Sequence, residues 1–225
     1  MEIIRIRLLG SVNIGLYAKA TNKYLIYHSD IVRRRVEKLL SKLDVLGLPV
    51  KPINTRVISP FIAVNSRGII ISKYTYPDIK ESIKNVAIEH GLELVELDTK
   101  YTAVGNLIII NDNAALVSPI IPTSSRKLIA DRLDVEVSCA TIGRTSYIGS
   151  LLVANNHGAL AAPIIRDDEL EIIKSVLHVD IYTGTVNNGI QFISSGLIAN
   201  DKVVFVGEDT VGRELFVISQ AFGGG

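Results

Sequence analysis

The sequence is poor in cysteine, in unbalanced charge and in long apolar runs, and each shortage excludes a class of protein. A single thiol, Cys139, excludes an internal disulfide framework and suits a reducing compartment such as the cytoplasm. Lys and Arg number 24 against 23 Asp and Glu, a formal net charge of +1, whereas a protein that holds nucleic acid mainly through phosphates is usually far more basic. Any nucleic-acid partner must therefore meet a local patch or share the contact with protein.

Long apolar segments are missing as well. Hydrophobic residues make up 48% of the chain, but runs such as 106–111 and 158–165 fall short of the roughly 18 residues that suggest a membrane span. The first ten residues, MEIIRIRLLG, carry charges inside their apolar stretch, which argues against a signal peptide. We therefore expect a cytoplasmic protein with no membrane contact, and 225 residues are enough to bury a sizeable core.

What the sequence does contain is an internal repeat. Residues 106–121, NLIIINDNAALVSPII, and residues 150–165, SLLVANNHGALAAPII, share a leucine, an asparagine, an Ala-Leu pair and a Pro-Ile-Ile ending at a spacing of 44 residues. Asparagines between short apolar runs extend the repeat to five units: Asn22, Asn65, Asn111, Asn155 and Asn200. Asparagine between two strand-like runs predicts a hairpin turn, so we interpret these residues as turn residues without a catalytic role.

A helical segment and a third strand follow the hairpins. In the first unit the predicted helix has Ser29 or Asp30 as its cap and one apolar stripe, formed by Val32, Val36, Leu39, Leu40 and Leu43. In the second unit Pro77 suits the first turn of the helix and Gly91 its end. Residues 135–142 and 179–186 are typical of strands. Each unit is therefore predicted to run strand, strand, helix, strand.

The fifth unit lacks its closing strand, because the chain ends soon after the helical stretch that follows Asn200. Residues 1–8 precede the first unit and have the pattern of such a strand. We therefore predict a single domain over 1–225 of the α/β (α+β) class, a closed ring of five ββαβ repeats about a pseudo-fivefold axis, sealed by the N-terminal strand. The repeats are approximately 14–56, 57–103, 104–147, 148–191 and 192–220, with the closing strand at 1–8.

Several motifs resemble, in order, those of the translation initiation factor 6 family. They are NIGLYAKATNKY (13–24), RVI (56–58), AVGNLIIINDNAALVSP (103–119), DRLDVEV (131–137), GSLLVANNHGALAAP (149–163), TGTVNNG (183–189) and GLIANDKVVFVGEDTVGREL (196–215). The resemblance covers essentially the whole chain and is weakest at residues 28–50. The short C-terminus is similar to that of the archaeal branch.

The resemblance implies the five-bladed propeller known as the pentein fold and a function that needs no chemistry. Members bind the large (50S) ribosomal subunit on its intersubunit face, near the sarcin–ricin loop of its RNA and adjoining ribosomal proteins, and prevent premature joining of the small (30S) subunit. Release in relatives involves an elongation-factor-type GTPase with a ribosome-maturation cofactor, which implies a role in large-subunit maturation. We accordingly expect a monomer that is not an enzyme and holds no cofactor or metal.

Candidate contact residues lie where each unit enters its first hairpin. Small residues recur six positions before the turn asparagine, or seven in the first unit: Gly15, Ser59, Gly105, Gly149 and Ser194. They predict crowding near the ring axis, and they mark that end of the ring as the one closest to a partner. The ribosome-binding candidates are Asn13, Gly15, Tyr17, Arg56, Ser59, Gly105 and Asn106, with Arg213 and Glu214 of the C-terminal helix as weaker ones.

Two interpretations stay open for other polar residues. The run Arg33–Arg35 is either a solvated helix face or a patch for RNA phosphates. Guanidine-modifying enzymes share the ring fold and use a Cys nucleophile with a His base, so an enzymatic alternative would rest on Cys139, which the apolar run 135–142 predicts to be buried and inert. The four histidines do not cluster in sequence, and no phosphate loop or metal-ligand spacing is present.

Overall fold

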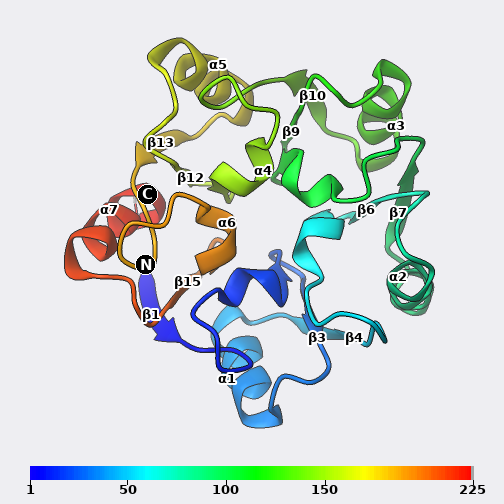
Figure 1. Ribbon diagram of the computed structural model, residues 1–225, viewed down its shortest axis with the longest axis horizontal. Helices are drawn as coiled ribbons and strands as arrows, with labels where there is room; N and C mark the ends of the chain where they lie inside the picture. Colours follow the sequence, from blue (N-terminus) through cyan, green and yellow to red (C-terminus); the bar gives the residue numbers. More distant parts are fainter. Residues whose placement is uncertain (224–225) are drawn as a thin grey trace.

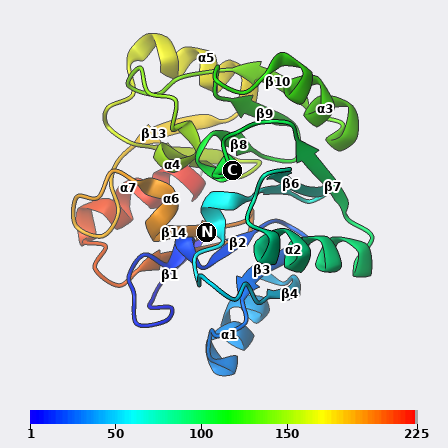
Figure 2. The same ribbon diagram turned by 45° about the vertical axis from the view of Figure 1, so that its right-hand side comes forward.

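The strands of the protein are arranged in small sheets that share one make-up. The computed structural model describes residues 1–223, which form five three-stranded sheets arranged about a central axis (Figure 1). In each sheet an antiparallel hairpin is joined by a parallel third strand, and a long helix lies at the rim of the ring (Figures 1 and 2). The unit strand, strand, helix, strand predicted from the sequence is therefore confirmed.

The sheets and the helices have the following bounds. The sheets are β2 (Ala18–Ala20), β3 (Tyr24–His28) and β4 (Leu46–Val50); β5 (Ala63–Asn65), β6 (Gly68–Ser72) and β7 (Glu93–Leu97); β8 (Ile108–Ile110), β9 (Ala114–Val117) and β10 (Glu136–Cys139); β11 (Leu152–Ala154), β12 (Gly158–Ala161) and β13 (Asp180–Thr183); and β14 (Leu197–Ala199), β15 (Val203–Gly207) and β1 (Glu2–Ile6). The long helices are α1 (Arg33–Leu43), α2 (Pro77–Glu89), α3 (Thr123–Leu133), α5 (Asp167–Leu177) and α7 (Gly212–Gly223). Short helical turns precede the first strand of each hairpin: η1 (Ile14–Leu16), η2 (Ser59–Phe61), η3 (Val104–Asn106), α4 (Ile148–Leu151) and α6 (Ile193–Gly196).

The N-terminal strand closes the ring, as predicted. Strand β1 pairs in parallel with β15, so that Glu2 lies opposite Val203 and Ile6 opposite Gly207. The first and the last parts of the chain therefore share one sheet, which Figure 1 shows as the blue strand beside the red helix. Without β1, strand β15 would present unpaired backbone groups to other chains.

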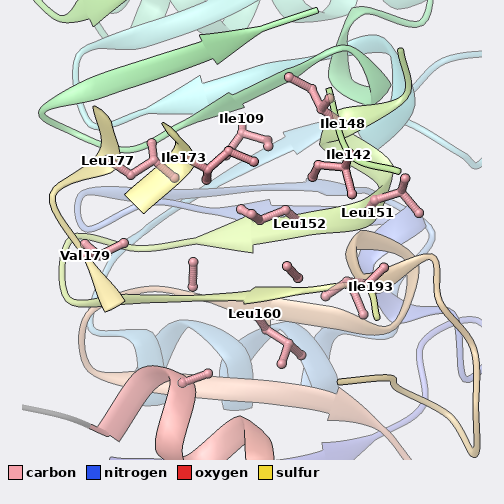
Figure 3. Packing of buried hydrophobic residues seen from close by; sticks show 14 of the residues in the cluster. Ile109, Ile142, Ile148, Leu151, Leu152, Leu160, Ile173, Leu177, Val179 and Ile193 are labelled. Carbon is pink, nitrogen blue, oxygen red and sulfur yellow. The ribbon is translucent and has the colours of Figure 1, made fainter. Parts of the chain in front are cut away.

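The core lies between the sheets and the long helices. The middle strands β6, β9, β12 and β15 bury every residue, and for this reason their sequences are continuous apolar runs rather than alternating ones. In the largest cluster Ile173 and Leu177, one turn apart on α5, pack with Ile109 of β8 (Figure 3). Each fully buried side chain of this size contributes roughly 1.5–3 kcal/mol relative to its exposure.

The predicted cap of the first helix is wrong. Helix α1 begins after Val32, which makes no side-chain cap hydrogen bond. Ser29 and Asp30 instead belong to the turn that leaves β3, where the N–H of Asp30 donates to Nδ1 of His28 at 3.1 Å. The apolar stripe is confirmed in its centre, since Val36, Leu39 and Leu43 are buried, whereas Val32 is exposed.

The second helix has its predicted ends. Pro77 is its first residue, and Gly91, with φ of 62°, follows its C-terminal cap. The left-handed backbone at Gly91 carries no steric penalty because glycine has no Cβ. Among residues 1–223, none of the helices is both long and apolar enough to cross a membrane.

Candidate functional site

The ring axis has two ends that differ in their chemistry. The first strand of each hairpin begins directly after a short helical turn and ends at the hairpin turn, so the five short turns surround the axis at one end (Figure 1). We call this the small-residue end. The five hairpin turns surround the axis at the opposite end, which we call the asparagine end.

At the small-residue end the backbones of neighbouring turns touch. A Cβ atom on Gly15 would collide with the carbonyl oxygen of Ser194, one on Gly105 with that of Ser59, and one on Gly149 with that of Gly105. Gly15, Ser59 and Gly105 are buried. The crowding predicted from the spacing is therefore observed, and these three residues determine the shape of this end. Their contribution to binding stays a prediction.

The four other predicted contact residues lie beside this crowded centre. Arg56 leaves 65% of its side chain exposed, and its Nε atom lies 3.1 Å from Oδ2 of Asp30. Asn13 directly precedes η1, and Asn106 is the last residue of η3. Both residues are half-buried. Tyr17 is half-buried because its ring packs on the core beneath the turn. Of the four, Arg56 is the one whose side chain is largely exposed to solvent.

Two exposed aromatic residues at this end were missed in the sequence. Tyr147 and Phe192 each leave 60% of their surface accessible. Each stands two positions before the small residue of its unit, which is the position that Asn13 occupies in the first unit. The repeat spacing alone could have located them. Exposed aromatic side chains of this kind are enriched at protein interfaces.

Carboxylates of the long helices hold the loops of the small-residue end. Glu169 accepts hydrogen bonds of 2.7 and 3.0 Å from the backbone N–H groups of 143–144, and Glu214 accepts bonds of 3.0 and 2.8 Å from those of 188–189. Asp78 accepts two such bonds from another loop. Burial alone would raise the pKa of Glu169 and Glu214, but the hydrogen bonds they accept lower both below the usual value. The loops are therefore ordered before any partner arrives.

At the asparagine end, four asparagines make the same contacts. In each, the side-chain oxygen accepts hydrogen bonds of 2.8–3.1 Å from the N–H groups two and three positions later. The side-chain nitrogen donates to a backbone carbonyl of the next unit, as from Asn111 to Asn155 at 3.2 Å. These residues are Asn65, Asn111, Asn155 and Asn200. They are turn residues, as predicted, and they also join neighbouring units.

The prediction for the first unit is wrong by one residue. Thr21, not Asn22, has the role of the other asparagines, because its Oγ1 atom accepts the N–H groups of Lys23 and Tyr24 at 3.1 and 3.0 Å. With Thr21 as the turn residue, the small residue precedes its turn residue by six positions in every unit. Threonine has no amide to donate to the next unit. The hydroxyl of Tyr24 takes that place, 2.7 Å from the carbonyl oxygen of Asn65.

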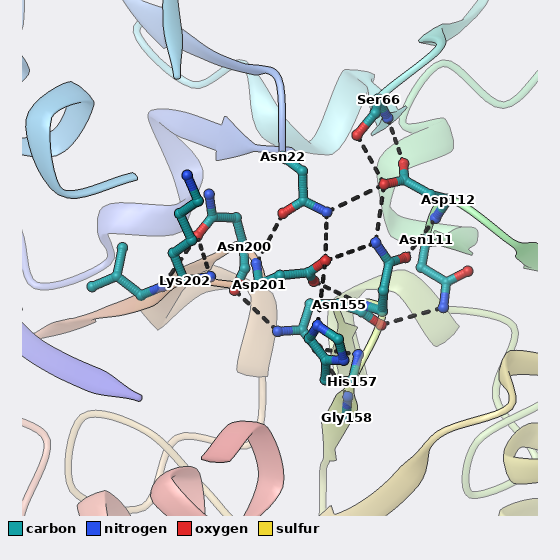
Figure 4. A network of polar contacts seen from close by, with 12 residues as sticks. Asn22, Ser66, Asn111, Asp112, Asn155, His157, Gly158, Asn200, Asp201 and Lys202 are labelled. Carbon is teal, nitrogen blue, oxygen red and sulfur yellow. Dashed lines mark hydrogen bonds and ion pairs between the residues drawn. The ribbon is translucent and has the colours of Figure 1, made fainter. Parts of the chain in front are cut away.

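Asn22 belongs instead to a second polar ring, formed by the residues that follow the turn residues (Figure 4). The Asp112 carboxylate accepts hydrogen bonds from the N–H of Ser66 at 2.7 Å and from Nδ2 of Asn156 at 3.0 Å. Asp201 accepts from Nδ2 of Asn22 at 2.7 Å and of Asn156 at 2.9 Å. Burial alone would raise the pKa of Asp112, but its hydrogen bonds, first those from Asn156 and Ser66, lower it. The polar atoms of this end are thus used within the protein.

The interior of the axis leaves little room for a ligand. A cavity of ≈ 80 Å³ lies among the first strands of the hairpins, and another of ≈ 30 Å³ lies at the asparagine end, between the hairpin turns. Small-molecule sites usually measure roughly 300–1,000 Å³. Lys19 lines the larger cavity, and its Nζ atom donates to the carbonyl of Ile62 at 3.0 Å. Desolvation lowers the pKa of Lys19 to about 8. Within residues 1–223, no cluster of three or more His, Cys, Asp or Glu is arranged to hold a metal ion.

Cys139 lies away from the axis, at the end of β10. It is half-buried rather than fully buried, and Nη1 of Arg126 lies 2.6 Å from its sulfur. In residues 1–223 none of the four histidines is hydrogen-bonded to this sulfur. His157, for example, belongs to the asparagine end, with Nε2 at 3.7 Å from Oδ2 of Asp201. Within the described part of the chain, the side chain hydrogen-bonded to the thiol is thus the Arg126 guanidinium.

Comparison with known proteins places the chain among relatives of its own length. The model of the eIF-6 family matches residues 3–221. The chain is 41% identical over 228 residues to "Translation initiation factor 6" of Cenarchaeum symbiosum (strain A), covering 100% of both chains. It is 41% identical over 225 residues to the protein of the same name from Pyrococcus furiosus, covering 99% of both.

Solved structures with a similar fold are enzymes of distant sequence. A dimethylarginine dimethylaminohydrolase has a TM-score of 0.51 at 13% identity, over 89% of this chain and 96% of that chain. The apo structure of ArgZ, a cyanobacterial arginine dihydrolase, has a TM-score of 0.53 at 14% identity, over 78% of this chain and 33% of that chain. At such identities the likeness concerns the fold alone. The predicted pentein fold, a ring of five ββαβ units, is confirmed.

Proposed function

Because the chain belongs to the eIF-6 family of translation initiation factors, we propose that it binds the large (50S) ribosomal subunit and prevents its joining with the small (30S) subunit. The observation that carries the proposal is the family match over residues 3–221. The proposal includes a monomer in the cytoplasm and a role in large-subunit maturation. It also includes docking near the sarcin–ricin loop and release by an elongation-factor-type GTPase with a maturation cofactor, as the family resemblance implies.

An anti-association factor acts as an obstacle, and an obstacle needs a rigid surface rather than reactive groups. Rigidity lowers the cost of binding because few side chains and loops have to be ordered on contact. The closed ring, the touching turns around Gly105 and the loops held by Glu169 and Glu214 support this role. A standard interface of roughly 800 Å² on each partner would be enough to occupy the joining surface.

We assign docking to the small-residue end. The polar atoms of the asparagine end are used in bonds between the units, whereas Arg56, Tyr147 and Phe192 at the small-residue end are largely exposed. Arginine and aromatic residues are the types that most often carry interface energy. Asn13 and Asn106 lie beside them and complete the proposed contact set.

We further propose that the protein catalyses no reaction. An enzyme of the kind that shares this fold would need a base beside Cys139, and the group that faces the sulfur is the Arg126 guanidinium, which cannot accept a proton. Incubation with arginine or agmatine should therefore release no product above the uncatalysed rate.

The test of function is co-sedimentation with separated ribosomal subunits on a sucrose gradient, followed by a subunit-joining assay. We expect the protein to travel with the large subunit alone and to reduce the amount of joined ribosomes in proportion to its concentration. Bovine serum albumin at the same concentration is the control for non-specific trapping. A protein that stays at the top of the gradient at low salt would contradict the proposal.

A further inference from the structure

Helix α1 carries an unusual concentration of positive charge. It contains five cations, Arg33, Arg34, Arg35, Lys38 and Lys42, and a single carboxylate, Glu37. Over the whole chain, cations exceed carboxylates by one. The rest of the protein therefore carries slightly more negative than positive charge, and α1 carries a local excess of positive charge.

Part of this charge has no partner within the protein. Arg33 lies 2.8 Å from Glu37, and Lys42 lies 2.9 Å from Glu2. By contrast, Arg34, Arg35 and Lys38 are exposed and have no carboxylate oxygen within 4.0 Å among residues 1–223. We call these three residues the α1 basic patch.

The position of the patch is unfavourable for the helix itself. The N-terminus of a helix carries partial positive charge, so cations in the first turn destabilise the helix and carboxylates stabilise it. Helices α2, α5 and α7 follow this rule, with acidic residues in the first turn, and α3 has neither acidic nor basic residues in its first three positions. Helix α1, by contrast, begins with three arginines and has no acidic residue in its first turn. A local rule that is broken without a gain in stability points to a functional requirement.

The patch adjoins the proposed docking end. Strand β3 runs toward the small-residue end, where the N–H of His28 donates to the carbonyl of Tyr17, directly after η1. Helix α1 starts five residues later, so its first turn lies at the same end. The Arg56–Asp30 pair links the loop before α1 to the loop that carries Arg56. The α1 basic patch is thus adjacent to the small-residue end.

The charge is also one-sided. Helix α5 carries Asp167, Asp168, Glu169 and Glu171 against Lys174, and it lies across the axis from α1 (Figure 1). A polyanion is attracted to the α1 side and repelled from the α5 side. Such a charge difference orients a partner during encounter.

We propose that the α1 basic patch binds the phosphodiester backbone of RNA in the large ribosomal subunit, an inference that rests on the proposed function. Arginine is suited to this partner because its planar guanidinium donates two parallel hydrogen bonds to a phosphate. The patch supplies the salt-dependent part of binding, and the exposed residues of the small-residue end supply the rest. Its two arginines and one lysine neutralise up to three phosphates.

The experiment compares two triple variants that remove the same charge. Arg34→Gln/Arg35→Gln/Lys38→Gln removes the patch, and Lys23→Gln/Lys84→Gln/Lys127→Gln removes three exposed lysines from elsewhere. Dissociation constants for purified archaeal large subunits are measured between about 50 and 200 mM KCl. Each phosphate contact contributes about 0.7–0.9 to the slope of log K against log salt. For the patch variant we expect the magnitude of this slope to fall by about 2 to 3 and the affinity near 100 mM KCl to fall at least about tenfold. The control variant should keep the slope and the affinity of the wild type.

Two further measurements make the result decisive. Arg34→Lys/Arg35→Lys should keep most of the slope, because a lysine also neutralises phosphate. Thermal unfolding of the patch variant should be unchanged or slightly higher, which separates lost binding from lost folding. A patch variant with the affinity and slope of its control overturns the inference.

Purified large-subunit RNA, free of protein, separates this inference from the proposed function. If the wild type fails to bind intact subunits, the proposed function fails. The binding of the two variants to purified RNA still tests whether the α1 basic patch binds RNA. Weaker RNA binding by the patch variant than by the control supports the inference, and equal or absent RNA binding overturns it. Binding to vesicles containing about a third of anionic lipid, lost in the patch variant without any loss on RNA, would assign the patch to a membrane surface and also overturn it.

Discussion

The two ends of the axis are built by the same repeat, yet they use their polar atoms in opposite ways. At the asparagine end, Asp112 and Asp201 accept hydrogen bonds from neighbouring units, and Asn111 reaches across to Asn155. At the small-residue end, the backbones touch in the centre and the surrounding side chains, such as Phe192, remain exposed. At the asparagine end the polar side chains hold the ring together, even where their types differ from unit to unit. At the small-residue end the residues around the crowded centre differ between the units and remain exposed, and we propose these for binding.

The position two residues before the small residue illustrates this difference. In chain order it is occupied by Asn13, Val57, Ala103, Tyr147 and Phe192. Ring closure requires only that the following turn be small, so this position is free to vary. The variation gives a face with different chemistry on each side, which is what recognition of an asymmetric partner needs.

The largest effect is expected from filling the centre of the small-residue end. Gly105→Ala places a Cβ against the carbonyl oxygens of Ile62 and Ser59, so two backbones must move apart, and we expect a loss of about 3 kcal/mol in the free energy of unfolding. Urea unfolding measures this loss. Gly212→Ala is the matched control, because a Cβ there meets nothing within 4 Å and alanine favours the helix. Equal stability of the two variants would show that the centre is not tightly packed.

The next effect tests whether the asparagine end is structural. Asp112→Ala leaves the N–H of Ser66 without this acceptor and removes one of the two carboxylates that accept from the amide of Asn156, which costs about 2–3 kcal/mol, while the affinity for the large subunit should be unchanged. A loss of affinity with unchanged stability would reverse the roles of the two ends.

The same variant has a pH signature. Because the folded pKa of Asp112 lies below its unfolded value, its contribution is present above about pH 4 and is lost as the pH falls through the folded value. Wild type and Asp112→Ala should therefore approach each other in stability below about pH 4. Urea titrations at pH 7 and at acidic pH measure this convergence.

Substitutions of exposed residues at the small-residue end should have the opposite effect to Asp112→Ala, lowering affinity and leaving stability unchanged. Arg56→Glu, Asn106→Ala and Phe192→Ala are expected to weaken binding to the large subunit about tenfold or more each, which corresponds to about 1.4 kcal/mol, with no change in melting temperature. Phe216→Ala is the control for Phe192→Ala, since Phe216 is similarly exposed, at 66%, but lies on the rim helix α7. A change in melting temperature without a loss of binding would remove these residues from the docking face.

Features that recur in every unit could be predicted from the sequence, whereas features that do not recur in every unit could not. The turn asparagines and small residues were found because each unit needs the same geometry. The first unit was assigned out of register because Asn22 matches the other units in type, whereas Thr21 matches them in role. Loop anchoring by Glu169 joins residues 25 to 28 positions apart, and no spacing rule predicts it. The repeat spacing locates the position of Tyr147 and Phe192, but no two units have the same residue there, so residue type did not mark it as a site.

Lys19 lies between the two ends of the axis. Its substitution is expected to have the smallest energetic effect of these predictions, a rise in the free energy of unfolding. Its counterparts in the other units are Ala63, Ile109, Val153 and Ile198, so a cation stands where the repeat has apolar residues. Burial lowers the pKa of Lys19 to about 8, which means that the charged form is disfavoured in the folded state. Lys19→Met should therefore stabilise the protein at pH 7 by about 1 kcal/mol, once the lost hydrogen bond to the Ile62 carbonyl is subtracted.

The pH dependence of that stabilisation identifies its cause. Between pH 8 and about 10.5 the unfolded lysine holds its proton while the folded one has released it, so wild-type stability rises with pH relative to the variant. The advantage of Lys19→Met should be constant below pH 8 and should shrink above it. Urea unfolding at pH 7 and pH 10 measures both values. If the variant is instead less stable at pH 7, the bond from Lys19 to Ile62 outweighs the burial of the charge, and Lys19 belongs with the groups that hold the ring together.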